Sequence, residues 1–269
     1  MSGLRCVSLL SDYGLEDGFV AACHGVLTRI APDARIIDIT HLVPAGDVRR
    51  GATVLAQTVP YLPAGIHVAV VDPGRAGSRR GVAVAAGDRI FVGPDNGVLS
   101  WAVHSESGPM AAYELTNAKL WLEPVSATFR GRDVYAPVAA HLANGLDLAA
   151  VGPPLAPDRL TTLSPPVRRV RVDDGAVEGE VLSIDRFGNV QLSVTVPDLE
   201  LLGTAAELQL TLGRRSLAVP FRDSWAAVAP GELVAYADAA GCVALAVNSG
   251  NAAQVLALPP GARVKVRLG

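Results

Sequence analysis

The stretch of sequence that decides the fold is Gly65-Ile-His-Val-Ala-Val-Val-Asp-Pro-Gly-Arg-Ala-Gly-Ser-Arg-Arg-Gly81. Its residues Val68 to Val71 are β-branched or small and show no polar alternation, so we expect a buried, parallel strand. Pro73 lacks a backbone donor and Gly74 permits a positive φ, so the strand ends there and presents the Asp72 carboxylate at its carboxyl end. Ligands of open α/β sheets bind at that edge. The same residues are also compatible with a simple turn whose arginines are solvated.

The segments around this strand repeat an α/β pattern. Asp12 follows a short apolar strand, as Asp72 does, and the next expected helix has Glu16 and Asp17 at its start, where acids suit the helix dipole. Capping is an alternative role for Asp12 and Asp17. We therefore predict an N-terminal α/β domain over residues 1–160, with a largely parallel sheet and flanking helices. Its expected elements are strands at 5–10, 36–39 and 65–71, helices at 16–30, 48–58 and 134–142, and a hairpin of 81–85 with 89–92.

The last third of the chain has a different pattern. A Pro-rich segment, 161–172, is predicted to be a linker. Beyond it, regularly spaced short strands separated by Gly, Pro and Asp turns predict a smaller all-β domain over residues 173–269, either a barrel or a sandwich. The expected strands are 176–184, 190–194, 207–212, 215–219, 233–237, 243–247 and 263–267.

Composition narrows the classes of function. The 269 residues carry a net charge of −3 and no basic stripe, which argues against nucleic acid as a partner. The apolar runs are too short to span a membrane and the N-terminus lacks the pattern of a signal peptide, so we expect a cytoplasmic protein that acts on a small molecule. Three widely spaced cysteines and no His or Cys cluster predict neither disulfides nor a metal site. His24 is expected to pack or to face solvent rather than to bind a metal.

Four polar clusters could carry chemistry or could be ordinary turns. The loop 126–133 has three charged residues just before a predicted helix, which favours a salt-bridged cap over an anion site. The composition of 93–97 predicts a turn, which could also present Asn96 to a ligand. The clusters 185–189 and 248–251 each contain asparagines. An asparagine presents a donor and an acceptor side by side, which matches the edge of an adenine ring.

Six motifs together carry a resemblance that none of them carries alone. They are Leu10-Ser-Asp-Tyr-Gly14, Val71-Asp-Pro-Gly74, Gly93-Pro-Asp-Asn-Gly97, Thr128-Phe-Arg-Gly-Arg-Asp133, Phe187-Gly-Asn189 and Asn248-Ser-Gly250. In order and spacing the chain resembles the S-adenosyl-L-methionine (SAM) hydroxide adenosyltransferases, which are relatives of the fluorinase and chlorinase. The resemblance implies an α/β N-terminal domain, a β-barrel-like C-terminal domain, and a homotrimer whose active sites lie between the N-terminal domain of one subunit and the C-terminal domain of the next.

The resemblance also implies roles for six residues in binding SAM. Asp12 would accept hydrogen bonds from both ribose hydroxyls, and Asp17 would contact the methionine amino group. Phe187 would stack on adenine. The edge of the adenine ring would be bound by Asn189 and Asn248, together with the backbone near Ser249.

Three further residues would surround the nucleophile. Asp72 and Arg79 match two members of the family's Asp-Arg-His set, which positions and activates water. Halogenating relatives have a tyrosine at the position of Asp72, which favours water over halide. The third member, a histidine in the hydrolases, is Arg130 here, and an arginine stays protonated and cannot act as a base. Its charge could still lower the pKa of a nearby water.

The resemblance therefore predicts that the protein hydrolyses SAM, by attack of activated water on ribose C5′, to adenosine and L-methionine. SAM would be the substrate, with no cofactor and no metal. Two alternatives remain. Arg130 is compatible with a non-catalytic or weakly catalytic protein that binds SAM or adenosine. The relationship to the fluorinase and chlorinase is compatible with a SAM-dependent halogenase.

Overall fold

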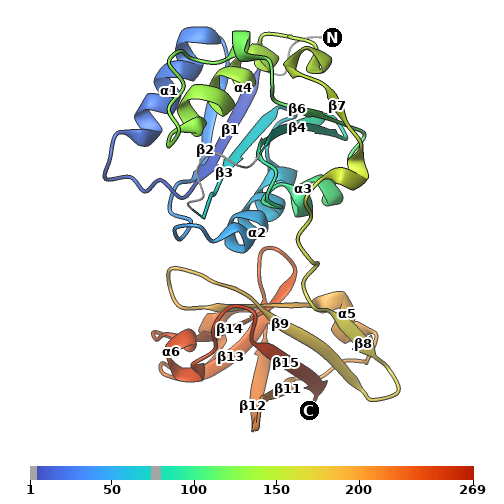
Figure 1. Ribbon diagram of the computed structural model, residues 1–269. Coiled ribbons are helices and arrows are strands. Elements are labelled where there is room, and N and C mark those ends of the chain that lie inside the picture. Colours follow the sequence, from blue (N-terminus) through green and yellow to red (C-terminus); the bar gives the residue numbers. More distant parts are fainter. Residues whose placement is uncertain (1–4, 74–79) are drawn as a thin grey trace. The chain divides into compact units, whose positions relative to one another are not determined.

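The computed structural model describes residues 5–73 and 80–269 (Figure 1). The chain divides into two compact units, Met1–Ser164 and Pro165–Gly269. Within the described residues, no helix is both long enough and apolar enough to cross a membrane.

The first unit is built on a sheet of seven strands in the order β2-β1-β3-β5-β4-β6-β7. Strands β2, β1, β3 and β5 run parallel to one another, which confirms the predicted, largely parallel sheet. The remaining strands, β4, β6 and β7, are added to β5 through antiparallel pairs. The first of these pairs, β4 with β5, is the predicted hairpin. The bounds are β1 (Cys6–Ser11), β2 (Arg35–Thr40), β3 (Ile66–Val70), β4 (Gly81–Ala86), β5 (Arg89–Pro94), β6 (Ala111–Glu114) and β7 (Pro154–Leu155).

Helices cover both faces of this sheet and enclose two apolar cores. The bounds are α1 (Phe19–Ile30), α2 (Val48–Thr58), α3 (Ser100–Ser105) and α4 (Ala136–Ala143). Helices α1 and α4 pack together on one face, and α2 and α3 on the other (Figure 1). Successive strand residues alternate between the cores, as a pleated strand requires: Val68 faces α1 and α4, whereas Ala69 faces α2 and α3. Strands β1 and β3 are buried throughout because they are central.

The order of the strands places a topological switch point between β1 and β3. From β1 the chain crosses through α1 to β2 on one side, and from β2 it crosses through α2 to β3 on the other. The loops that follow β1 and β3 therefore diverge at the carboxyl edge of the sheet, where open α/β folds bind ligands. The register pairs Ser11 with Val70, so that Asp12 and Asp72 leave the sheet at adjacent positions.

Two predicted helix starts differ from the structure. Helix α1 begins at Phe19, with Gly18 as its N-cap and no acid in its first turn, so Glu16 and Asp17 lie in the preceding bend. Phe19 packs edge-on against Phe129, a tertiary contact that the sequence pattern does not reveal. At the other helix, a wide π-type turn at Gly131–Tyr135 precedes α4, so the helical backbone starts earlier than predicted.

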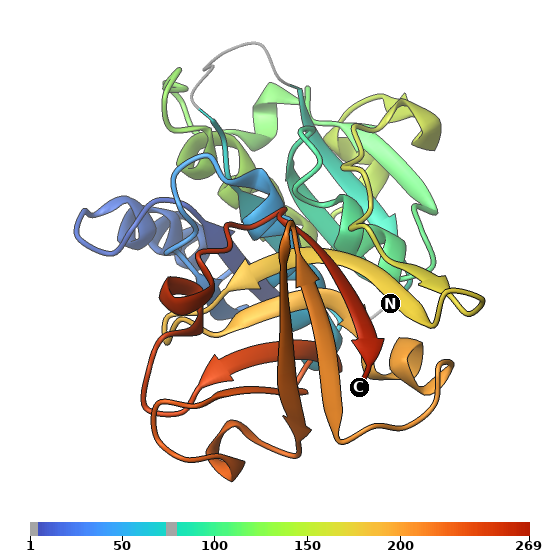
Figure 2. The ribbon, with the colours of Figure 1, turned by 90° about the horizontal axis from the view of Figure 1, so that it is seen from below.

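The second unit is a closed β-barrel, as its predicted strands indicate (Figure 2). Its sheet runs β10-β14-β13-β12-β11-β15-β9-β8, and it closes because β10 also pairs with β9. Most pairs are antiparallel, but β12 and β13 are parallel. The bounds are β8 (Arg169–Arg171), β9 (Ala176–Ile184), β10 (Val190–Thr195), β11 (Glu207–Leu212), β12 (Arg215–Arg222), β13 (Leu233–Ala237), β14 (Cys242–Val247) and β15 (Arg263–Leu268).

Short elements complete the two units. Strand β8 lies inside the segment expected to be a linker and pairs with β9, so this part of the segment belongs to the barrel unit. Two short helices, α5 (Val196–Glu200) and α6 (Ala252–Leu256), connect barrel strands. Single 3₁₀ turns occur at Val59–Tyr61, Ala118–Leu120, Leu148–Val151, Pro157–Arg159 and Trp225–Ala227.

Candidate active site

Two carboxylates, Asp12 and Asp72, lie together at the switch point. Oδ2 of Asp12 accepts a hydrogen bond of 2.8 Å from the backbone N–H of Gly46. Burial raises the pKa of the Asp12 carboxyl and the Asp72 charge raises it further, whereas the backbone amides of Gly46, Asp12 and Asp72 partly offset this rise by favouring the charged form. The loop after β1 thus meets both the turn after β3 and the loop before α2.

Glycine is required where these loops meet. Gly46 has a φ of +71°, and a Cβ added there would lie 3.0 Å from Cα of Pro73. Both the left-handed backbone and the close approach favour glycine at this position. The Gly46 N–H can therefore reach Asp12 while the loop rests against the turn that carries Asp72.

Two tyrosines and Arg130 surround the carboxylates. Burial raises the pKa of Tyr13, and the charges of Asp12 and Asp72 raise it further. Burial also raises the pKa of Tyr135, to about 12, although Arg130 opposes that shift. The guanidinium carbon of Arg130 lies 5.7 Å from the centroid of the Tyr135 ring. Both phenols are therefore neutral at physiological pH and can donate a proton in a hydrogen bond.

The loop that carries Arg130 is held by packing and by an ion pair. A Cβ on Gly131 would lie 1.9 Å from the Tyr13 hydroxyl oxygen, so only glycine allows this tyrosine to approach. Next to it, Asp133 is 1% exposed and accepts two hydrogen bonds from Arg132, at 2.6 and 3.0 Å, and a third from the backbone N–H of Ser126. Burial acts to raise the pKa of Asp133, but these bonds outweigh it and lower the pKa. The predicted salt bridge is therefore present, as the pair of Arg132 and Asp133, but no side chain of the described residues caps the helical turn that begins at Gly131.

Asn96 supports the end of β3 from the neighbouring loop. Its Nδ2 donates to the carbonyl of Val71 at 2.7 Å, and its Oδ1 accepts from the N–H of Val98 at 3.1 Å. The side chain thus acts within the protein, in agreement with the predicted turn. Because Val71 immediately precedes Asp72, Asn96 also helps to set where that carboxylate leaves the sheet.

Two further residues were predicted for this part of the site. Arg79 lies outside the described residues. Asp17 is exposed in the bend before α1.

The barrel unit contains the second group of predicted residues. A cavity of about 330 Å³ is lined by Phe187, Asn189, Trp225, Ala246, Val247, Ser249 and Gly250. Three of the four residues predicted for the adenine therefore line one cavity, and the fourth, Asn248, precedes Ser249 in the same loop. Phe187 is 68% exposed and Trp225 is 51% exposed, so two aromatic rings are accessible there. Trp225 was not predicted, because a lone tryptophan between strands has no motif around it.

Hydrogen bonds orient both asparagines of this cavity region. Asp185 binds the backbone N–H groups of Phe187 and Asn189 with one oxygen, and Nδ2 of Asn189 with the other at 2.7 Å. Nδ2 of Asn248 donates to the carbonyl of Val228 at 2.7 Å. Oδ1 of Asn248 accepts from Oγ of Ser249 at 3.2 Å. Each amide has a second N–H that can serve a ligand, and each oxygen has lone pairs for a further hydrogen bond. The Asp185 turn thus has a structural function that also sets the position of Asn189.

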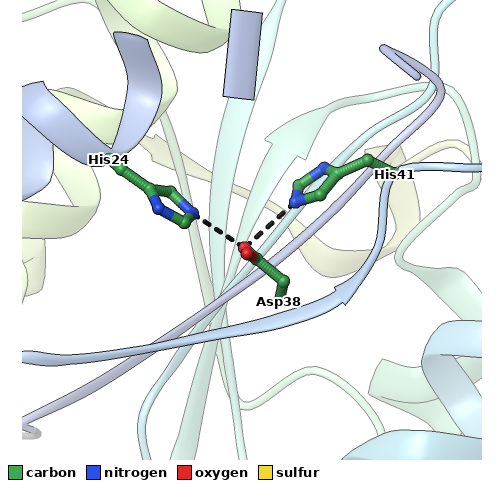
Figure 3. A group of neighbouring side chains, drawn as sticks. All are labelled: His24, Asp38 and His41. Atoms are coloured by element: carbon green, nitrogen blue, oxygen red, sulfur yellow. Dashed lines mark hydrogen bonds and ion pairs between the residues drawn. The ribbon is translucent and has the colours of Figure 1, made fainter. Parts of the chain in front are cut away.

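One further side-chain group was not predicted. The side chains of His24, Asp38 and His41 lie together (Figure 3). His41 also contacts Ser11, the residue before Asp12. Partial burial acts to raise the pKa of Asp38, but the two imidazoles outweigh it and lower the pKa. The side chain of His24 is 34% exposed, in line with the expectation that it packs or faces solvent, and its Nε2 lies 2.8 Å from Oδ1 of Asp38.

Comparisons with known proteins agree with this architecture. A family model for the SAM hydroxide adenosyltransferase N-terminal domain matches residues 7–152, and one for the C-terminal domain matches residues 179–265. A crystal structure of an uncharacterized conserved protein from Thermotoga maritima has a TM-score of 0.89 and 34% identity, covering 97% of this chain and 99% of that one.

Three curated relatives extend over both units. An (R)-S-adenosyl-L-methionine hydrolase of Salinispora tropica is 52% identical over 263 residues, which are 98% of each chain. A protein of the same name from Thermus thermophilus is 40% identical and covers 98% of this chain and 100% of its own. A fluorinase of Nocardia brasiliensis is 30% identical and covers 98% of this chain and 97% of its own. From these matches across both units, the chain belongs to the SAM hydroxide adenosyltransferase family.

Proposed function

We propose that the protein hydrolyses SAM to adenosine and L-methionine, by attack of a water or hydroxide oxygen on ribose C5′. The observation that carries this proposal is the pair of carboxylates, Asp12 and Asp72, at the switch point of the sheet, one for the ribose and one for the nucleophile. The relatives named as SAM hydrolases support it as well, since they are 40% and 52% identical whereas the fluorinase is 30% identical.

In this proposal the substrate is held at its two ends. Asp12 accepts hydrogen bonds from the ribose hydroxyls, and Asp17 contacts the methionine amino group. Phe187 stacks on the adenine, whose edge is bound by Asn189, Asn248 and the backbone near Ser249. The cavity that three of these residues line supports this arrangement, because an accessible aromatic ring beside an amide suits a purine.

The reaction balances without a cofactor. The C5′–O bond forms as the C5′–S bond breaks, and the electron pair of that bond neutralises the sulfonium. One proton of the water stays on the new 5′-hydroxyl and the other is released. Because the leaving group is a neutral thioether, no acid has to protonate it. When hydroxide attacks, its negative charge and the positive charge of the sulfonium are both lost in the reaction. A site that excludes water favours this loss of charge.

Asp72, Arg79 and Arg130 surround the nucleophile in this proposal. Arg130 stays protonated, so it polarises the water but cannot accept its proton. Asp72 is the group that can accept a hydrogen bond from the water and direct its oxygen toward C5′. The hydroxyls of Tyr13 and Tyr135 are neutral and lie near enough for the Asp72 charge to raise their pKa values, so they can donate hydrogen bonds in the same region.

The proposal includes a homotrimer with shared active sites. Asp12 and Asp72 belong to the first unit, whereas Phe187, Asn189 and Asn248 belong to the barrel unit. A complete site therefore needs a first unit and a barrel unit, which we infer come from neighbouring subunits.

Chromatography of the purified protein incubated with SAM, with and without chloride, tests the proposal. We expect adenosine and methionine in equal amounts under both conditions and no 5′-chloro-5′-deoxyadenosine. Intact SAM that co-elutes with the protein would indicate a binding protein instead. The chlorinated nucleoside at millimolar chloride would indicate a halogenase.

A further inference from the structure

His24, Asp38 and His41 converge from three places in the first unit (Figure 3). His24 lies on α1, Asp38 on β2, and His41 directly after β2. The Nε2 atoms of His24 and His41 lie 2.8 and 3.0 Å from the same Oδ1 atom of Asp38. One ligand atom from each residue lies within 4.8 Å of the other two.

We propose that these three side chains bind a divalent transition-metal ion, with Zn²⁺ as the best match. Two imidazole nitrogens and one carboxylate oxygen are ligands that zinc prefers, and three protein ligands leave a fourth position for water. Bonds of 2.0–2.1 Å in tetrahedral geometry place the ligand atoms roughly 3.3 Å apart. The two contacts of 2.8 and 3.0 Å therefore need to widen by only a few tenths of an ångström.

His41 is already oriented as a metal ligand. Its side chain is 4% exposed, and its Nδ1 lies 2.7 Å from Oγ of Ser11. Metal-binding histidines commonly bond their second ring nitrogen in this way, which fixes the ring orientation. Its Nε2 is buried and has no hydrogen-bond partner among the described residues, although Oδ1 of Asp38 is close. The oxygen thus lies away from the direction in which an N–H of this ring would point. Nε2 of His41 and Oδ1 of Asp38 could instead both bind a metal ion that lies between them.

The other two ligands leave a path for the ion and for water. The side chains of His24 and Asp38 are 34% and 41% exposed, respectively. With both imidazoles neutral, the carboxylate gives the group a net charge of −1, which attracts a divalent cation. The competing arrangement without an ion is the hydrogen bond from His24 to Asp38, and it leaves Nε2 of His41 buried without a hydrogen bond.

An ion at this position would stabilise the segment that carries Asp12. His41 contacts Ser11, the residue before Asp12, and its carbonyl accepts a hydrogen bond of 2.8 Å from the N–H of Gly14. The ion would thereby connect α1 and the end of β2 to the loop after β1. It would be structural, outside the chemistry at C5′, so this inference does not depend on the proposed function.

Calorimetric titration of untagged, chelator-treated protein with zinc chloride tests the inference. We expect one equivalent to bind and the Tm to rise with zinc concentration, because an ion that binds only the folded state stabilises it. His24→Ala and Asp38→Asn should each weaken binding by more than about tenfold and abolish the rise in Tm. His104→Ala, which removes an exposed histidine of α3, should behave as the wild type.

Circular dichroism of the zinc-free variants checks that they fold, and the partly exposed side chain of His24 makes its variant the more secure test. The inference is wrong if wild-type protein shows no saturable zinc binding. It is equally wrong if His24→Ala and Asp38→Asn bind zinc as tightly as His104→Ala does, because the ion would then be held by other groups, such as the three cysteine thiols.

Discussion

Replacing Asp12 with asparagine should weaken binding of adenosine without weakening the fold. The amide has the shape of the carboxylate but only one acceptor oxygen, and that oxygen is required by the N–H of Gly46, 2.8 Å from Oδ2 in the wild type. At least one charge-assisted hydrogen bond to the ribose is then lost. Such a bond contributes roughly 1.5–3 kcal/mol. The dissociation constant should therefore rise by about 10- to 150-fold.

The same substitution is predicted to leave the stability of the fold unchanged or to increase it. Burial holds the pKa of Asp12 above its usual value, so the folded state binds this proton more tightly than the unfolded state does. The stability that the protonated carboxyl contributes is therefore lost as the pH rises through the raised pKa, and at neutral pH the charge is a cost. Asp12→Asn removes that charge, so the free energy of unfolding at pH 7 should stay equal or increase.

Calorimetry with adenosine measures the affinity without turnover, and a thermal melt at pH 7 measures stability. Asp33→Asn, which neutralises an exposed aspartate in the turn after α1, is the matched control and should change neither. Unchanged adenosine affinity in Asp12→Asn, with a lower Tm, would refute the reasoning. It would mean that Asp12 only holds the Gly46 loop in place.

Three further experiments test the site and the packing around it. Arg130→Ala should lower turnover with little change in SAM affinity, because an effect confined to the transition state appears in the rate. Arg130→His should restore activity, and this activity should fall at acidic pH, near the histidine pKa of about 6.5, because a protonated imidazole cannot accept a proton. Equal rates for the arginine, alanine and histidine forms would place this residue outside the chemistry. Gly131→Ala should lower stability by about 1–3 kcal/mol, because its Cβ would lie 1.9 Å from the Tyr13 hydroxyl oxygen. Gly25→Ala, in open space on α1, should raise stability by up to about 1 kcal/mol, and equal melting temperatures for the two variants would contradict the packing argument. Mixing inactive Asp72→Ala and Asn189→Ala chains under subunit exchange should restore activity if sites are shared, and no mixture should recover it if each site is built within one chain.

Local patterns were sufficient to predict most of the strands and the switch-point carboxylates. The apolar run 66–71 has one plausible environment, a central strand, and the turn chemistry of Pro73 places Asp72 at its end. Barrel strands such as β9, β11 and β13 were predicted with their bounds, because their turns are marked by Gly, Pro and Asp. Strands β6 and β8 are only a few residues long and were missed, since they depend on pairing with a neighbour.

Contacts between distant segments could not be predicted in the same way. The approach of Tyr13 to Gly131 joins two loops that no periodicity relates, and it determines how the loop of Arg130 is held. His24 and Asp38 are 14 residues apart and meet only because α1 returns the chain to β2. The parallel pairing of β12 with β13 is likewise invisible in a sequence that otherwise alternates strands and turns.

The central claim is that a water oxygen attacks C5′ of SAM, and isotope labelling tests it most directly. SAM is incubated with the protein in water enriched in oxygen-18, and the isolated adenosine is analysed by mass spectrometry with fragmentation. We predict one heavy oxygen per adenosine, located in the 5′-hydroxyl, with none in the methionine formed at the same time. Unlabelled adenosine, or a heavy oxygen in the methionine fragment instead, would contradict the account.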